Sequence, residues 1–151
     1  MNFTFEVCQP LDPQLHGQVP SLAQALPEDL LQAYAPRLRT PVEWPRKRFR
    51  QHRTRKTADA LWKARLALPK DSTFRIYFME HGLQVESDGE ESPVIPYSDM
   101  RCIVESEDLI LLGLTGRGVL LAKGELAFLP VPLFAEALSG RLPWIRAAGT
   151  P

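Results

Sequence analysis

The pattern of apolar and polar positions changes at about residue 73. From there to residue 134, short apolar runs are separated by turn residues, and most runs alternate with the period of two of a half-buried strand. A helical pattern covers residues 132–138, with Pro132 at its start and Gly140 after its end. The predicted strands are residues 74–79, 83–86, 94–97, 100–105, 109–114, 119–122 and 126–129.

Before this block, the pattern predicts one strand and two helices. Residues 2–7 alternate strictly, and since an isolated strand of this length is unstable, we expect it to pair with the later sheet. Pro27 and the two acidic residues after it suit a helix start, so residues 27–34 are predicted as a short helix. A longer helix is predicted over residues 46–68, where Pro69 ends it.

Together these elements predict an α+β fold. We expect an antiparallel, strongly bent sheet or partly open barrel that packs with a C-terminal helix, plus an N-terminal strand and helices. A chain of 151 residues is ample for one hydrophobic core and short for two. The predicted organisation is therefore an N-terminal extension (residues 1–56), one domain (residues 57–146) and a flexible tail (residues 147–151).

Charge is distributed unevenly, although the formal net charge is zero. Residues 37–75 hold thirteen Lys and Arg against three acids, whereas residues 76–110 hold nine acids and one Arg. An uneven distribution of this kind bears on the choice of partner surfaces more than the total does.

The most basic segment is residues 46–56, with seven fixed positive charges in eleven positions. It has three interpretations: the solvated face of the predicted helix, a surface for an acidic protein or an anionic membrane lipid, or a nucleic-acid patch in which Phe49 stacks on bases. No DNA- or RNA-binding motif accompanies it. Trp44, just before it, is either anchored on the domain or exposed for a partner.

No pattern of catalytic or metal-binding residues stands out. Cys8 and Cys102 are far apart and lie in apolar or strand-like surroundings, which favours two reduced buried thiols. The three histidines are single, no metal-ligand spacing occurs, and the glycines at 113, 116 and 118 fit a hairpin better than a phosphate loop. We therefore expect no enzyme, cofactor, metal or small-molecule substrate. The absence of a signal peptide or long apolar segment predicts a soluble, cytoplasmic protein, with the inner face of the membrane as the alternative location.

Four short motifs occur in a recognisable order: Gly82-Leu83 after a strand, residues 95–100 (IPYSDM), residues 105–109 (ESEDL), and residues 127–134 (AFLPVPLF). In this order they resemble the YcxB-like protein family, whose soluble part is similar to a pleckstrin-homology-like barrel. The resemblance covers roughly residues 58–140 and implies no enzyme activity. The chain departs from the family at Tyr97, where tryptophan is usual, at Val131, where lysine is usual, and in lacking the transmembrane hairpin.

The resulting hypothesis is a non-catalytic protein-protein interaction module, of which a small cytosolic inhibitor such as a toxin-immunity protein is one version. The alternatives are peripheral binding to anionic membrane lipid through residues 46–56 and, third, nucleic-acid binding. The candidate partner-binding residues are Trp44, Arg46, Lys47, Arg48, Arg50, Arg53, Glu86, Asp88, Glu90 and Glu91.

Overall fold

The computed structural model describes residues 2–7, 11–34, 45–68 and 74–149. These residues form a mixed α+β fold with two sheets and four α-helices. The strands are β1 (Phe3–Val7), β2 (Phe74–Phe78), β3 (Gly82–Ser87), β4 (Glu90–Glu91), β5 (Ile95–Pro96), β6 (Met100–Glu105), β7 (Leu109–Leu114), β8 (Arg117–Ala122) and β9 (Trp144–Arg146). The α-helices are α1 (Val19–Gln24), α2 (Glu28–Tyr34), α3 (Arg46–Leu66) and α4 (Val131–Ser139), and short 3-10 helices are η1 (Pro13–Gln18), η2 (Tyr97–Asp99) and η3 (Lys123–Glu125).

The first sheet is antiparallel and contains the N-terminal strand. Its order is β1-β2-β3, and the two-residue strands β4 and β5 both pair with β3. Phe5 of β1 lies opposite Ile76 of β2, so the predicted pairing of residues 2–7 with the later sheet is confirmed. Alternation places Phe3 and Phe5 in the core, while Glu6 faces outward beside Arg75.

The second sheet has the order β8-β7-β6-β9, and it corrects the prediction of a purely antiparallel sheet. β9 runs parallel to β6, with Ile103 opposite Trp144. A parallel pair requires a long crossover connection, and here the chain between β6 and β9 contains β7, β8 and α4. The short β9 was not recognised in the sequence because three residues carry too little periodicity.

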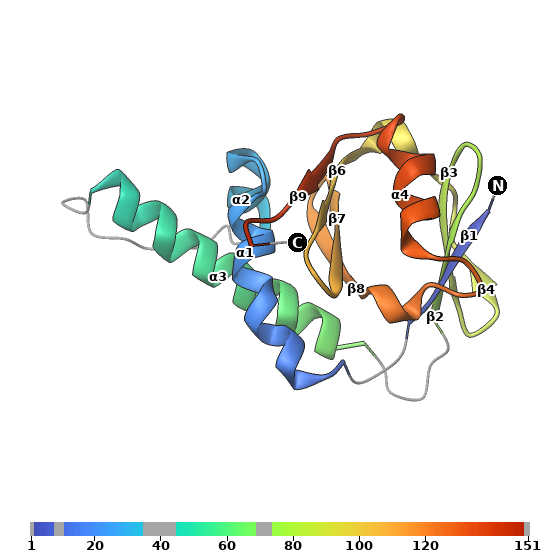
Figure 1. The fold of residues 1–151 in the computed structure, drawn as a ribbon, viewed down its shortest axis with the longest axis horizontal. Coiled ribbons are helices and arrows are strands. Elements are labelled where there is room, and N and C mark those ends of the chain that lie inside the picture. The colour runs from blue at the N-terminus through green and yellow to red at the C-terminus, as the bar shows by residue number, and fades with distance from the viewer. Residues whose placement is uncertain (1, 8–10, 35–44, 69–73, 150–151) are drawn as a thin grey trace.

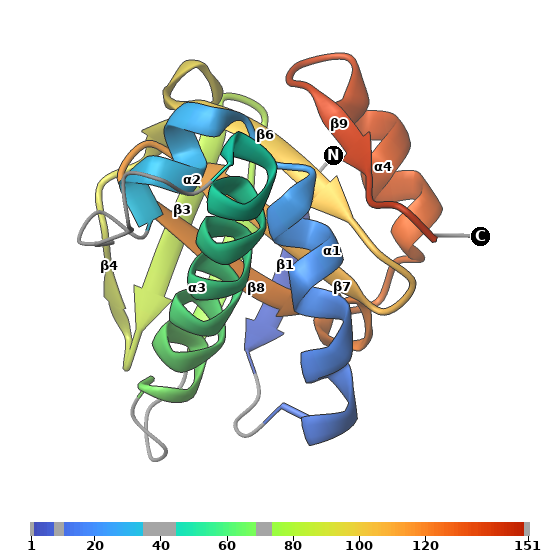
Figure 2. The same ribbon diagram turned by 90° about the vertical axis from the view of Figure 1, so that its left-hand side faces the viewer.

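Figure 1 shows three layers from left to right: α1 to α3, the second sheet, and the first sheet. α4 packs against the core between the two sheets from one side, as Figure 2 shows. One hydrophobic core lies between the two sheets, where Phe134 of α4 makes edge-to-face contacts with Phe3, Phe5 and Phe78 at centroid distances of 5.3, 5.1 and 4.9 Å. Another lies between the second sheet and the N-terminal helices. All six residues of β7 are buried because both faces of that sheet are covered.

Two predicted strands differ from the structure. Residues 126–129 form no strand, and only one bridge joins Leu126 to Phe5. The strand predicted over residues 94–97 is reduced to Ile95–Pro96, and Tyr97 already begins η2. Within the described residues, the two sheets do not close into a barrel.

The predicted helices are confirmed over residues 28–34, 46–66 and 131–139. The interpretation of residues 46–56 as a solvated helix face holds only in part, because Arg53 is buried. In the part of the chain that the structure covers, none of the helices is both long enough and apolar enough to cross a membrane.

Arg65 of α3 forms a buried ion pair with Glu125 of η3, with 2.6 Å between Nη2 and Oε2. Both side chains also bond the outer edge of β8, whose one partner among the described strands is β7. Arg65 donates to the carbonyl oxygen of Leu120 at 2.8 Å, and the Ala122 N–H donates to Glu125 at 2.8 Å. The pair therefore fastens α3 to the second sheet and satisfies backbone groups that an uncovered edge would expose.

We predict that breaking this pair destabilises the fold strongly. Arg65→Met or Glu125→Gln leaves a buried charge or carbonyl group without its partner, and we expect each to lower the free energy of unfolding by about 3–5 kcal/mol. Urea denaturation with linear extrapolation measures the change. Arg101→Met, which removes the exposed Arg101–Asp29 pair, serves as the control and should have little effect. An equal effect from the exposed and buried pairs would contradict this role.

Cys102 lies in β6, buried against the N-terminal helices. Its thiol is free, and burial raises its pKa from the ordinary 9.0 to about 11. Cys8, which was also predicted to be a reduced, buried thiol, lies outside the described residues.

The raised pKa of Cys102 predicts a loss of stability at alkaline pH. The thiol of the unfolded chain ionises near pH 9, whereas the folded one stays protonated until about pH 11, so the folded state binds more protons in this interval. We expect the free energy of unfolding of a Cys8→Ser variant to fall as pH rises from 9 to 11. Adding Cys102→Ala should make that fall shallower, and an unchanged pH slope would contradict the prediction.

Candidate functional site

The two charged segments singled out in the sequence lie at opposite ends of the molecule. The basic first turns of α3 project from one end of the long axis, and the β3–β4 hairpin lies at the other (Figure 1). Arg46, Lys47 and Arg48 are exposed on α3, and Glu90 and Glu91 are exposed on β4. The segments therefore cannot form two rims of one compact interface.

The acidic hairpin is a regular structural feature. Asp88 and Gly89 have φ angles of 51° and 85°, as a tight two-residue turn between antiparallel strands requires. Asp88 is exposed, whereas Glu86 is half-buried and accepts a hydrogen bond of 2.6 Å from the Tyr77 hydroxyl. Glu86 also lies 3.6 Å from Arg75, so its charge is already partly used within the sheet.

Fewer cations of residues 46–56 are exposed and unpaired than the sequence suggests. Arg50 pairs with Glu28 of α2. Arg53 is only 8% exposed and stacks over the Phe49 ring at 4.5 Å, which corrects its assignment as a partner-binding residue. Arg53 lies on the same face of α3 as the buried Thr57 and Leu61, one and two turns further along the helix. Trp44 lies outside the described residues.

Three cations of α3, Lys47, Arg50 and Arg55, border a groove between α1 and α3, the two helices that lie side by side in Figure 2. The groove, called here the α1–α3 groove, has a volume of about 440 Å³. Apart from Pro20, the lining residues have cationic, amide or hydroxyl side chains, and none has a carboxylate. The lining residues are Pro20, Ser21, Gln24, Lys47, Arg50, Gln51, Thr54 and Arg55.

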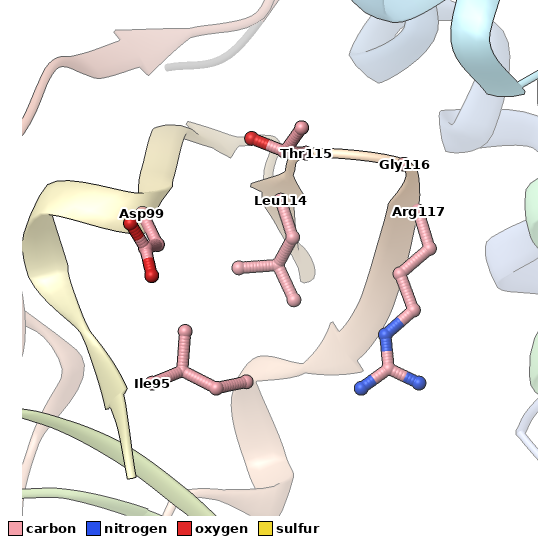
Figure 3. Close-up of a pocket in the computed structure, with 6 residues that line it drawn as sticks. All are labelled: Ile95, Asp99, Leu114, Thr115, Gly116 and Arg117. Atoms are coloured by element: carbon pink, nitrogen blue, oxygen red, sulfur yellow. The ribbon is translucent and has the colours of Figure 1, made fainter.

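A second pocket, of about 600 Å³, opens between η2 and the β7–β8 turn. Ile95 and Leu114 point into it, while Asp99 and Arg117 lie on opposite sides (Figure 3). Thr115 and Gly116 complete the lining. The ionisable groups in this lining are one carboxylate and one guanidinium, and the structure gives no hydrogen bond from the Thr115 hydroxyl to Asp99 that would activate the hydroxyl. Nor do three or more His, Cys, Asp or Glu side chains gather anywhere in the described chain to hold a metal.

Phe128 is the most unusual surface residue of the structure. Its side chain is 98% exposed, the highest value among the exposed large apolar residues. Its φ angle is 65°, a region that residues other than glycine rarely adopt. The Leu129 N–H donates to the Ala127 carbonyl at 2.8 Å, which closes a three-residue γ-turn with Phe128 at its centre.

The turn is held from both sides. The Ala127 N–H donates to the Thr4 carbonyl of β1 at 2.8 Å, and Leu126 and Leu129 pack against the core between the sheets. With both flanks anchored, the chain turns Phe128 outward in a conformation that costs about 1–3 kcal/mol. An exposed ring in a strained turn gives no stabilisation within this chain.

Sequence reasoning missed Phe128 because the short apolar run from Leu126 to Leu129 predicted a strand. One available signal was the charge pattern, since ten consecutive residues from Leu126 to Ala135 carry no charge. A second large aromatic residue, Trp144 of β9, has a structural role. Its indole N–H donates to Glu105 at 3.0 Å, and its ring packs on Phe134.

We predict that Phe128→Gly raises stability, because glycine adopts positive φ without strain. The free energy of unfolding should increase by about 0.5–1 kcal/mol, less than the full strain since glycine also increases the entropy of the unfolded chain. Val94→Gly is the matched control, since Val94 is 46% exposed and has no positive φ. Val94→Gly should lower the free energy of unfolding measured by urea denaturation. A decrease of similar size for Phe128→Gly would contradict the backbone strain at Phe128.

Comparison of the chain with protein-family models, with curated proteins and with solved structures gave no match. The resemblance to YcxB-like proteins therefore stays a prediction.

Proposed function

We propose that the protein is a non-catalytic protein-protein interaction module in which Phe128 enters an apolar pocket of the partner protein. The observation that carries the proposal is the 98% exposed ring on a strained, doubly anchored turn. Aromatic side chains that fill a pocket dominate the binding energy of many interfaces. A rigid turn favours this use because little conformational entropy is lost on binding.

The surroundings of Phe128 favour a protein over a membrane. Pro130 and Pro132 are exposed, and Leu133 is 40% exposed, so the uncharged segment offers further apolar contacts. It contains no Lys or Arg, which a peripheral contact with anionic lipid would use. One phenyl ring alone supplies too little apolar area for stable membrane attachment.

Two more specific hypotheses belong to this proposal. The first is that the two sheets and α4 represent an open relative of the pleckstrin-homology-like barrel, as the resemblance to YcxB-like proteins implies. The other is that the partner is an enzyme which this chain inhibits, as a toxin-immunity protein does. An inhibitor needs a rigid protruding group and no catalytic residues of its own, which agrees with the geometry at Phe128.

The proposal is tested by site-specific photocrosslinking in the native host, followed by affinity measurement with the captured protein. p-Benzoylphenylalanine replaces Phe128 in one variant and Val94 in the control variant. We expect one discrete crosslinked protein for position 128 alone. The purified partner should then bind Phe128→Ala about 30-fold or more weakly than the wild-type chain, because truncating an interface anchor costs about 2 kcal/mol or more.

Val94→Ala is the control in the affinity measurement and should leave binding unchanged. Thermal unfolding of both variants excludes loss of fold as the cause. Equal crosslinking at positions 94 and 128, or full affinity for Phe128→Ala, would contradict the proposal.

A further inference from the structure

The α1–α3 groove contains positive charge that the fold does not use. Of its three cations, Arg50 pairs with Glu28 and donates to the Gln24 carbonyl at 3.3 Å. Lys47 and Arg55 are exposed and have no ion-pair partner among the described residues. After Glu28 neutralises Arg50, the groove retains the charge of two cations.

Helix geometry places Lys47 and Arg55 on the face of α3 that lines the groove. Lys47, Gln51 and Arg55 follow one another at intervals of four residues, so they lie on one face of α3. All three line the groove, and Ser21 and Gln24 of α1 line its opposite wall. Long cationic side chains can therefore converge on a ligand that the neutral donors of α1 also reach.

The donor set fits a phosphate group better than a carboxylate. A phosphomonoester carries about −1.5 to −2 charges at neutral pH and offers three strongly accepting oxygens. Two cations balance that charge, and the hydroxyl of Ser21 with the amides of Gln24 and Gln51 can donate to the remaining lone pairs. The volume of about 440 Å³ admits a group larger than the phosphate itself.

We propose that the α1–α3 groove binds a phosphomonoester, carried by either a soluble metabolite or a lipid headgroup. The site is independent of Phe128, so the inference does not rest on the proposed protein partner. The proposal assigns Lys47 and Arg55 a specific ligand, whereas their charge alone indicates only a general attraction to anions.

The test compares the two sources of phosphomonoester. Glycerol 3-phosphate is titrated into the isotope-labelled protein, and the amide signals of Ser21, Gln24 and Gln51 are followed by NMR. Sedimentation then compares two kinds of phosphatidylcholine vesicle with equal surface charge. One contains phosphatidic acid, a phosphomonoester, and the other contains phosphatidylglycerol, a phosphodiester. Saturable shifts of the groove amides, or preferential sedimentation with phosphatidic acid, would support the site and identify the soluble or lipid source.

A charge-matched pair of variants separates the groove from net charge. Lys47→Gln/Arg55→Gln should weaken binding about tenfold or more, because each lost charge-assisted hydrogen bond contributes more than a neutral one. Lys56→Gln/Lys63→Gln removes the same charge from exposed α3 positions that do not line the groove, and it should retain wild-type binding.

Equal weakening in both variants would overturn the proposal. So would equal binding to the two kinds of vesicle with no saturable shift by glycerol 3-phosphate, or no binding to either probe. Circular dichroism of each variant confirms that the fold is retained before binding is compared.

Discussion

The buried ion pair between Arg65 and Glu125 joins the parts of this fold that the chain order separates. Arg65 belongs to the helices that precede the main sheet block, and Glu125 follows the edge strand β8. Because both side chains also bond β8 backbone groups, the helical layer covers an edge that would otherwise be open to another strand. The covered sheet is then buried on both faces, which explains the continuous apolar sequence of β7.

The same pair is connected to the proposed binding residue. Glu125 ends η3, and the chain continues directly into the turn that carries Phe128. Glu125 fixes the start of this segment, the bond from Ala127 to Thr4 fixes its middle, and the buried side of Leu129 fixes its end. A strained residue persists only where its surroundings determine its conformation. The contacts that fix the segment from Glu125 to Leu129 therefore also hold Phe128 in its exposed position.

Much of the fold could be predicted from the sequence, because the spacing of apolar residues indicates helices and strands and the turn residues indicate where they end. The alternation around Phe5 and Ile76 predicted their strands, and Pro27 with the two acidic residues after it predicted α2. The candidate site could not be predicted as well. Arg53 and Arg65 resemble their exposed neighbours in sequence, and only the packing of α3 shows that they are buried. The local apolar run also placed Phe128 in a strand, whereas the structure has a γ-turn there that tertiary contacts hold on both sides.

Hydrogen exchange at the backbone amide of Ala122 tests the central claim most directly. This N–H points away from β7 and is protected only if Glu125 holds it, as the 2.8 Å bond indicates. If the ion pair makes the helical layer and the sheet one cooperative unit, the amide of Ala122 should exchange with a free energy close to that of Leu111 in the central strand β7. Exchange as fast as that of exposed Gly124 would show that the edge of β8 opens independently and that the pair does not hold the layers together.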